Sequence, residues 1–418
     1  MITAGIVAGN IIGFARVAVT AYLLGTGDAA DVLAVSLGSL DTFNQMLAST
    51  MVFAFVPMLT TLNGGERTAL FQQLNRAFAG IFLSLTAAIV VFAPGLINVL
   101  APGLDQEHFA PAVAVLRVGA ISTAAVGIAA VHSALLFTDR RFAPSAFHQA
   151  TLNTFTMAGA VLLWRFFGVY AFAIGYAAGA WVQFSMVYYA ARSSMPSAKP
   201  PEVSPHWGEL IAKPVSILGF SALIALNVVV TRAFATHAGP GTAAAFDYSM
   251  RCVGVPLAFL VSPMSNSLLP EIARLRSLGR LRDAFRLTDR TLALAAAAAV
   301  SGCALGIALR KPVIALLFQR GSFTAASTEL VAAVFLGFAP SLIGWSLLEL
   351  TARSLFGLDL TRLPLLAGAF AVAVNLGLLS FFRELRPEFI GVGSSVGLIL
   401  GFLLLQILAR ARRRRLLA

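Results

Sequence analysis

The sequence predicts an all-α polytopic membrane protein of about 12 transmembrane helices, arranged as two six-helix lobes that a parallel internal repeat relates. Composition, the number of long apolar stretches and the recurrence of short motifs predict this fold class. The chain of 418 residues is 58% hydrophobic and only 11% charged, with a mean hydropathy of +0.85. A soluble domain has about 25% charged residues, so a soluble fold is excluded.

Twelve apolar stretches have the length of about 20 residues that a helix needs to cross the hydrocarbon core of a bilayer. Their approximate limits are Ile2–Leu24, Val32–Leu59, Ala77–Leu100, Ala112–Phe137, Phe147–Trp164, Val169–Ala191, Val215–Ala235, Ala243–Leu269, Leu292–Leu309, Leu330–Leu350, Leu363–Phe381 and Ile390–Leu408. Because the first stretch lacks a basic leader and a small-residue cleavage site, we expect a retained span rather than a signal peptide.

Basic residues collect in alternate connections between these stretches. With a cytoplasmic N-terminus, the cytoplasmic connections and the C-terminal tail hold 20 of the 30 Lys and Arg residues, and the outer connections hold six. The positive-inside rule therefore predicts that both termini are cytoplasmic. Six arginines between Pro270 and Arg290 fit either an amphipathic helix that lies on the inner surface and contacts anionic membrane lipids, or a solvated loop. The tail Arg410–Arg415 is expected to contact anionic headgroups.

The chain divides into an N-terminal lobe at 1–192, a cytoplasmic linker at 193–210 that is rich in Pro and Ser, and a C-terminal lobe at 211–418. Motifs recur between the lobes at offsets of 213 to 222 residues. The recurring residues are Pro57 and Pro270, Pro94 and Pro312, Pro144 and Pro364, and Asn153 and Asn375. Six spans in each half give both lobes the same orientation, an architecture typical of transporters.

No pattern of catalytic, metal-binding or nucleic-acid-binding residues stands out. Ser395 lies in a G-x-S-x-G pattern, but inside a span, where Gly397 and Gly401 favour close helix packing over a nucleophile. The five histidines lack metal-ligand spacing, and His132 is interpreted as a helix-to-helix hydrogen bond. The net charge of +12 lacks the basic and aromatic interleaving of a nucleic-acid module. We therefore expect neither an enzyme nor a cofactor, a metal or a nucleic-acid partner.

Arg16 is the most informative charge, because it lies about 21 Å along the first apolar stretch and thus within the hydrocarbon. An unpaired guanidinium there costs at least about 2.5 kcal/mol, so it must face a polar interior with an anionic partner. Asp31, at the start of the next stretch, is a candidate for that partner. Arg16 then either locks two helices together or belongs to a substrate site.

Arg232 and Arg251 lie in the two spans of the second lobe that correspond to the first two spans of the chain. Arg232 fits either a cleft-facing position or one that extends to the headgroups. Arg251 fits either the cleft or a local pair with Asp247, one turn earlier. Several guanidiniums facing one cleft suit a diphosphate, whose oxygens accept bidentate hydrogen bonds. The predicted substrate-binding residues are therefore Arg16, Asp31, Arg232 and Arg251.

Short motifs along the whole chain resemble the MurJ/MviN family of lipid II flippases, within the multidrug, oligosaccharidyl-lipid and polysaccharide exporter superfamily. They are GFAR at 13–16, AAD at 29–31, FAFVP at 53–57, FAPSAFHQATLN at 142–153, RAFA at 232–235, MRCVGVP at 250–256, SLLPEIA at 267–273, LFQRGSFT at 317–324 and LFGLDLTRLP at 355–364. The resemblance implies alternating access, and cleft arginines that hold the diphosphate of an undecaprenyl-linked substrate; Arg16, Arg232 and Arg251 match family arginines.

The sequence departs from the family pattern at several positions within the spans. Val17 replaces an Asp, Asn10 replaces an Arg, Asn44 and Gln45 stand where the family has an Arg pair, Ala48 falls near its Glu, and Thr231 replaces an acidic residue associated with sodium in some members. No ion site is therefore carried over. The family's spans 13 and 14 have no counterpart in this sequence.

These observations predict a flippase for a polyprenyl-diphosphate-linked glycan, with lipid II for peptidoglycan synthesis as the leading substrate, in the bacterial cytoplasmic membrane. An exporter of another lipid-linked oligosaccharide, a multidrug-type exporter and a transport-inactive membrane scaffold are the alternatives. The excess of intramembrane arginines over acids argues against a site for cationic drugs.

Overall fold

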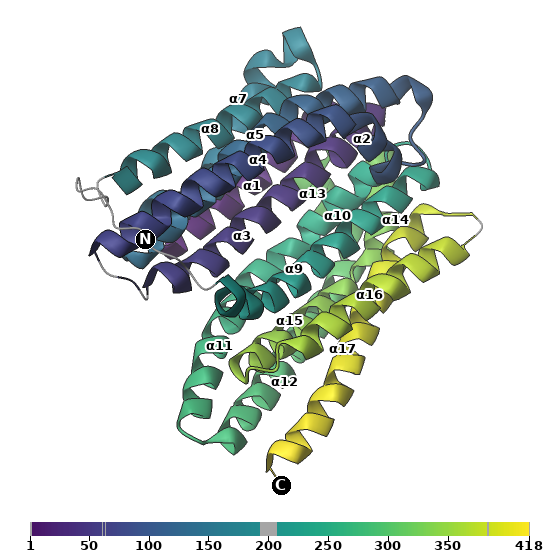
Figure 1. The fold of residues 1–418 in the computed structure, drawn as a ribbon. Helices are drawn as coiled ribbons and strands as arrows, with labels where there is room; N and C mark the ends of the chain where they lie inside the picture. The colour runs from purple at the N-terminus through teal and green to yellow at the C-terminus, as the bar shows by residue number, and fades with distance from the viewer. Residues whose placement is uncertain (1, 61, 63, 193–206, 383, 418) are drawn as a thin grey trace. The chain divides into compact units, whose positions relative to one another are not determined.

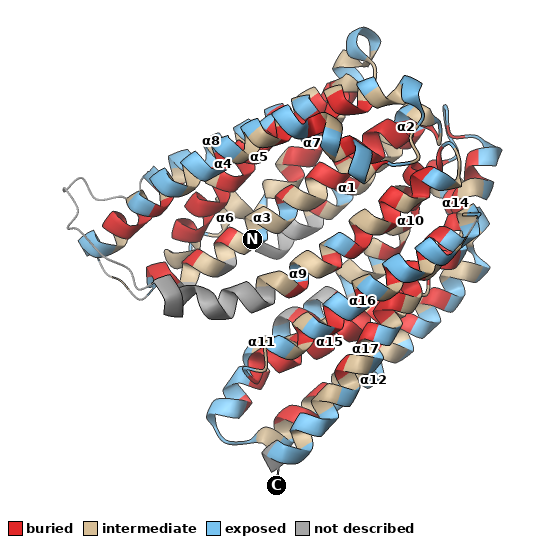
Figure 2. Ribbon diagram, turned by 45° about the vertical axis from the view of Figure 1, so that its right-hand side comes forward, coloured by how far each residue is buried: buried red, intermediate tan, exposed pale blue. Residues whose placement is uncertain are grey.

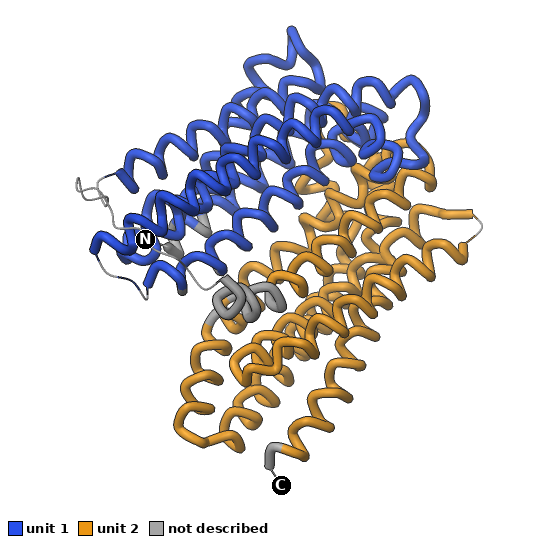
Figure 3. The backbone as a smooth tube through the Cα atoms, in the orientation of Figure 1, with its two compact units in different colours: residues 1–215 blue, residues 216–418 orange. Residues whose placement is uncertain are grey.

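The computed structural model describes residues 2–60, 62, 64–192, 207–382 and 384–417, and every regular element among them is a helix (Figure 1). The chain forms two compact units, Met1–Val215 and Ser216–Ala418 (Figure 3). The predicted linker at 193–210 falls largely outside the described residues. Each unit is therefore described by itself.

The first unit is a bundle with one central helix. Its helices are α1 (Ile2–Leu24), α2 (Asp28–Leu33), α3 (Ser39–Thr60), α4 (Gly64–Leu100), α5 (Gln106–Thr138), α6 (Ala143–Ala146), α7 (His148–Phe167) and α8 (Tyr170–Arg192). Helix α5 packs against α3, α4 and α8, and α7 packs against both α1 and α8. Most residues of α5 between Ala112 and Leu136 are small or apolar and are buried (Figure 2, where buried residues are red).

The second unit repeats this plan around α15. Its helices are α9 (Trp207–Ala235), α10 (Thr242–Pro256), α11 (Ser262–Ser277), α12 (Leu281–Ala308), α13 (Arg310–Phe318), α14 (Ala325–Phe338), α15 (Ser341–Gly357), α16 (Arg362–Phe381) and α17 (Pro387–Leu417). Helix α15 packs against α11, α12 and α17, and α17 also packs against α14 and α16.

The second long helix of each unit contains a π-helical segment. Ala34–Gly38 joins α2 to α3, and Leu257–Val261 joins α10 to α11. Pro256, directly before the second segment, cannot donate a backbone hydrogen bond. The helix bends by 45° a few residues later, between Phe259 and Pro263. Such π segments often lie at functional sites, and both lie next to the intramembrane charges described below.

Glycines allow two pairs of helices to approach closely. A Cβ on Gly175 in α8 would overlap the carbonyl oxygen of Phe155 in α7, and a Cβ on Gly397 in α17 would overlap that of Ala371 in α16. Ser395 of the G-x-S-x-G pattern is buried and donates to the carbonyl oxygen of Gly337 at 2.8 Å. The interpretation of that pattern as helix packing is confirmed.

Gly397→Ala is expected to destabilise the protein by about 1 to 3 kcal/mol, because the methyl group forces α16 and α17 apart. The measurement is the apparent melting temperature of the detergent-purified protein. Gly377→Ala in α16 is the matched control, since nothing lies within 4 Å of its Cβ position. Equal melting temperatures for the two variants would contradict the packing argument.

Seven described helices are long and apolar enough to cross a membrane, or up to nine when each bent pair counts as one span. The predicted class, an all-helical multi-pass membrane protein, is confirmed. Pro270–Arg290 forms neither the one separate helix nor the loop that the sequence allowed, but the end of α11 and the start of α12. After a turn at Gly279, which has a φ of 70°, helix α12 continues without a break from Leu281 to Ala308. The arginines therefore lie on a helical hairpin whose second helix continues directly into a span.

Candidate functional site

The first unit contains an ion pair between Arg16 of α1 and Asp41 of α3. Arg16 Nη2 lies 3.7 Å from Asp41 Oδ2, and the two side chains are 16% and 15% exposed. Asp31, which the sequence offered as the partner, lies ten residues earlier in α2 and is 4% exposed. The guanidinium therefore has its counter-charge within the bundle, but at a separation beyond hydrogen-bond distance.

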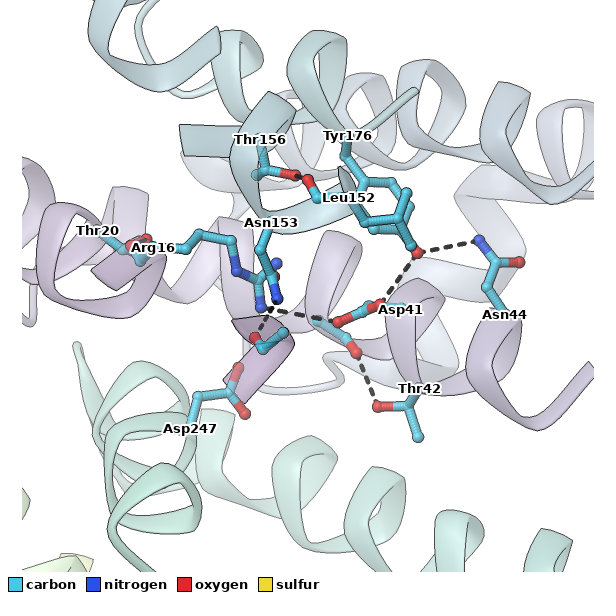
Figure 4. A network of polar contacts seen from close by, with 12 residues as sticks. Arg16, Thr20, Asp41, Thr42, Asn44, Leu152, Asn153, Thr156, Tyr176 and Asp247 are labelled. Atoms are coloured by element: carbon cyan, nitrogen blue, oxygen red, sulfur yellow. Dashed lines mark hydrogen bonds and ion pairs between the residues drawn. The ribbon is translucent and has the colours of Figure 1, made fainter. Parts of the chain in front are cut away.

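A series of hydrogen bonds fixes the carboxylate oxygen of Asp41 that does not face Arg16 (Figure 4). The Tyr176 hydroxyl of α8 donates to Asp41 Oδ1 at 3.1 Å. Asn44 Nδ2 contacts the Tyr176 hydroxyl oxygen at 3.3 Å and donates to Ser122 Oγ of α5 at 2.9 Å. Tyr176, Asn44 and Ser122 are buried, so three helices fix the carboxylate beside Arg16.

The second unit holds a much tighter pair. Arg232 of α9 donates to Asp247 Oδ1 of α10 through Nε at 2.9 Å and through Nη2 at 2.8 Å. Its side chain is only 1% exposed, against 27% for Asp247. The interpretation that Arg232 extends to the headgroups is wrong, because a carboxylate inside the unit satisfies the guanidinium.

Arg251 is half-buried in α10, one helical turn after Asp247 and five residues before Pro256. Residues four apart share one face of a helix, so Arg251 and Asp247 emerge on the same side of α10. The π segment at Leu257–Val261 begins six residues after Arg251. The second unit thus holds a buried arginine paired with Asp247 and a half-buried arginine one turn further along α10.

Equivalent polar contacts recur in both units. Asn153 of α7 donates to the carbonyl oxygen of Gly9 in α1 at 3.3 Å, and Asn375 of α16 donates to that of Asn227 in α9 at 3.2 Å. Asn375 also donates to Thr231 Oγ1 at 2.9 Å. Thr231 is fully buried and is occupied within this network of neutral groups.

The remaining polar residues singled out in the sequence have local roles. His132 Nδ1 bonds to the carbonyl oxygen of Ile128, 2.9 Å away in its own helix, so the predicted helix-to-helix hydrogen bond is wrong. The His132 ring instead packs edge-on against Phe71 and Phe184. Among the described residues, no group of three or more His, Cys, Asp or Glu side chains is placed to hold a metal ion.

Residues 20–416 match the sequence profile of the family described as "Lipid II flippase MurJ". The chain belongs to the MurJ family. The resemblance drawn from the motifs is therefore confirmed, and the MurJ family consists of membrane transporters and not of enzymes.

Relatives and solved structures agree with this assignment. A "Probable lipid II flippase MurJ" from Rhizobium meliloti (strain 1021) is 26% identical over 93% of this chain and 75% of the relative. The "Lipid II flippase MurJ" of Burkholderia cenocepacia is 22% identical over 85% and 72%. A structure titled "Lipid II flippase MurJ, inward closed conformation" matches with a TM-score of 0.86 at 18% identity, over 98% of this chain and 87% of that one. An inward-facing multidrug MATE transporter matches with 0.79 at 11%, over 97% and 95%. At these identities the solved structures show the shared fold alone.

Sequence reasoning found the arginines within the apolar stretches but missed most of their surroundings. Asp41 carried a signal, since it is one of few acidic residues inside a span. Tyr176 and Asn44 carried none, because a neutral residue in an apolar stretch gives no indication of its contacts. Asn44 stands where the family pattern has an arginine, and here it is a buried hydrogen-bond donor.

Proposed function

We propose that the protein is a flippase that moves a polyprenyl-diphosphate-linked glycan precursor across the bacterial cytoplasmic membrane by alternating access. Lipid II for peptidoglycan synthesis is the leading substrate. Membership in the MurJ family supports the class of transporter. The observation that carries the proposal is Arg16, an intramembrane guanidinium with a loosely held counter-charge at 3.7 Å and some exposure. Such a group is free to bind a diphosphate oxygen.

The proposed site assigns different roles to the four predicted residues. Arg16 and the half-buried Arg251 contact the diphosphate. Arg232 acts indirectly, because its guanidinium is buried and orients Asp247. Asp31 lies 216 positions before Asp247 and is buried, so we assign it to the polar surroundings of the site.

We further propose twelve spans in two lobes, 1–192 and 211–418, that the linker at 193–210 joins, with both termini in the cytoplasm. Helices α1, α7 and α8, of 23, 20 and 23 residues, supply the additional spans of the first lobe. The equivalent Asn153 and Asn375 contacts and the paired π segments support an internal repeat. The arginine-rich ends of α12 and α17 then face anionic lipids on the cytoplasmic side.

A multidrug-type exporter is the second candidate, because the MATE structure shares the fold at a TM-score of 0.79. A cationic drug would require an accessible acidic surface, whereas Asp247 and Asp41 each pair with an arginine. The site therefore favours an anionic substrate. A lipid-linked oligosaccharide other than lipid II remains within the same proposal, and a transport-inactive scaffold lies outside it.

The test is headgroup translocation in liposomes that contain the purified protein and fluorescent lipid II, with dithionite quenching as the readout. We expect faster quenching of inner-leaflet lipid than in protein-free liposomes. Parallel liposomes carry an undecaprenyl-diphosphate oligosaccharide without a peptide, or ethidium. Movement of ethidium alone would replace the flippase with a drug exporter. No transport of any probe, together with no rescue of cells depleted of their lipid II flippase, would indicate a scaffold.

A further inference from the structure

The ion pair of the first unit differs from that of the second unit in a way that bears on substrate exchange. Arg16 and Arg232 lie 216 positions apart, at equivalent places in the two helices that begin the units. Arg232 donates two hydrogen bonds of 2.8 to 2.9 Å to its carboxylate. Within the described part of the chain, the Arg16 guanidinium donates no hydrogen bond and approaches Asp41 only to 3.7 Å. Arg232 is therefore fully hydrogen-bonded to its carboxylate, whereas Arg16 is close to its carboxylate without a hydrogen bond.

We propose that Asp41 is an internal counter-anion, which neutralises Arg16 while the site is empty and yields it to the diphosphate of an incoming substrate. This inference rests on the proposed function. An arginine within a membrane requires an anionic partner at every stage, because its guanidinium remains charged. A carboxylate of the protein provides that partner before loading and after release.

Tyr176 sets how firmly Asp41 holds Arg16. Its hydroxyl binds Oδ1 of the carboxylate at 3.1 Å, and Oδ2 is the oxygen that faces Arg16. Asn44 in turn fixes the Tyr176 hydroxyl at 3.3 Å. This chain holds the carboxylate back from hydrogen-bond contact with the guanidinium. A diphosphate can offer the shorter bidentate contacts that Asp41 does not make.

The experiment measures the Kd of farnesyl diphosphate for the full-length protein in detergent, with farnesol as the uncharged control. Asp41→Asn removes the competing charge and is expected to tighten binding of the diphosphate about tenfold, which is about 1.4 kcal/mol. Tyr176→Phe frees the carboxylate to close on Arg16 and is expected to weaken binding. The double variant is expected to bind like Asp41→Asn, because Tyr176 acts through Asp41.

The two single variants are expected to change the Kd in opposite directions. General damage to the fold would instead weaken diphosphate binding in both Asp41→Asn and Tyr176→Phe. Glu66→Gln is the charge-matched control, since Glu66 is exposed at the start of α4. Unchanged or weaker binding in Asp41→Asn, while Arg16→Ala still loses affinity, would overturn the counter-anion role and leave the proposed function standing. Unchanged binding in Arg16→Ala would instead overturn the diphosphate grip of the proposed function.

Discussion

Arg16→Ala is expected to lower the rate of lipid II headgroup translocation at least about 100-fold, equivalent to about 2.8 kcal/mol. The substitution removes the accessible guanidinium of the first unit, which we propose to bind the diphosphate directly. Arg16→Lys retains the charge but loses the planar, bidentate geometry, so an intermediate rate is expected. The measurement is dithionite quenching of fluorescent lipid II in proteoliposomes.

Arg117→Ala is the matched control for this variant. Arg117 is an exposed arginine of the same unit, and its Nε donates to the carbonyl oxygen of Val90 in α4 at 3.1 Å. It therefore has a contact with the neighbouring helix but, among the residues that the structure describes, no ion pair with a carboxylate. A folded Arg16→Ala protein that translocates at the wild-type rate would remove Arg16 from the substrate site.

Asp247→Asn is expected to destabilise the protein by about 3 kcal/mol or more, because it leaves the buried Arg232 guanidinium without its counter-charge. The guanidinium cannot escape the cost by losing its proton. The melting temperature of the purified protein should therefore fall by several degrees. Asp41→Asn is expected to cost less than Asp247→Asn, because Arg16 is 16% exposed and makes no hydrogen bond to Asp41 that the substitution would break.

A double variant separates the unpaired charge from other effects at the same position. Replacing Arg232 with Met and Asp247 with Leu removes both charges, and apolar residues of similar volume often restore the stability lost by breaking a buried pair. We expect the double variant to recover most of the loss in Asp247→Asn. If the double variant is as unstable as the single variant, the destabilisation does not come from an unpaired Arg232.

The sequence determined the membrane class, the presence of most helices and the position of each charge along its helix, because each depends on local properties. Apolar length sets a span, and a rise of about 1.5 Å per residue places Arg16 within the hydrocarbon. The first predicted span, Ile2–Leu24, coincides with α1. The recurrence of motifs at nearly constant offsets also identified equivalent residues such as Asn153 and Asn375, which make equivalent contacts.

Only the tertiary structure decided which charges meet. Arg16 lies about 12 Å before the end of α1, whereas Asp31 and Asp41 lie about 5 and 20 Å into the helix that follows, so both are about equally distant in depth. The choice depends on the face from which each carboxylate emerges, and the π segment at Ala34–Gly38 between them changes that face. Helix rotation and packing are set by the whole bundle, through residues such as Tyr176 on α8, and no local pattern encodes them.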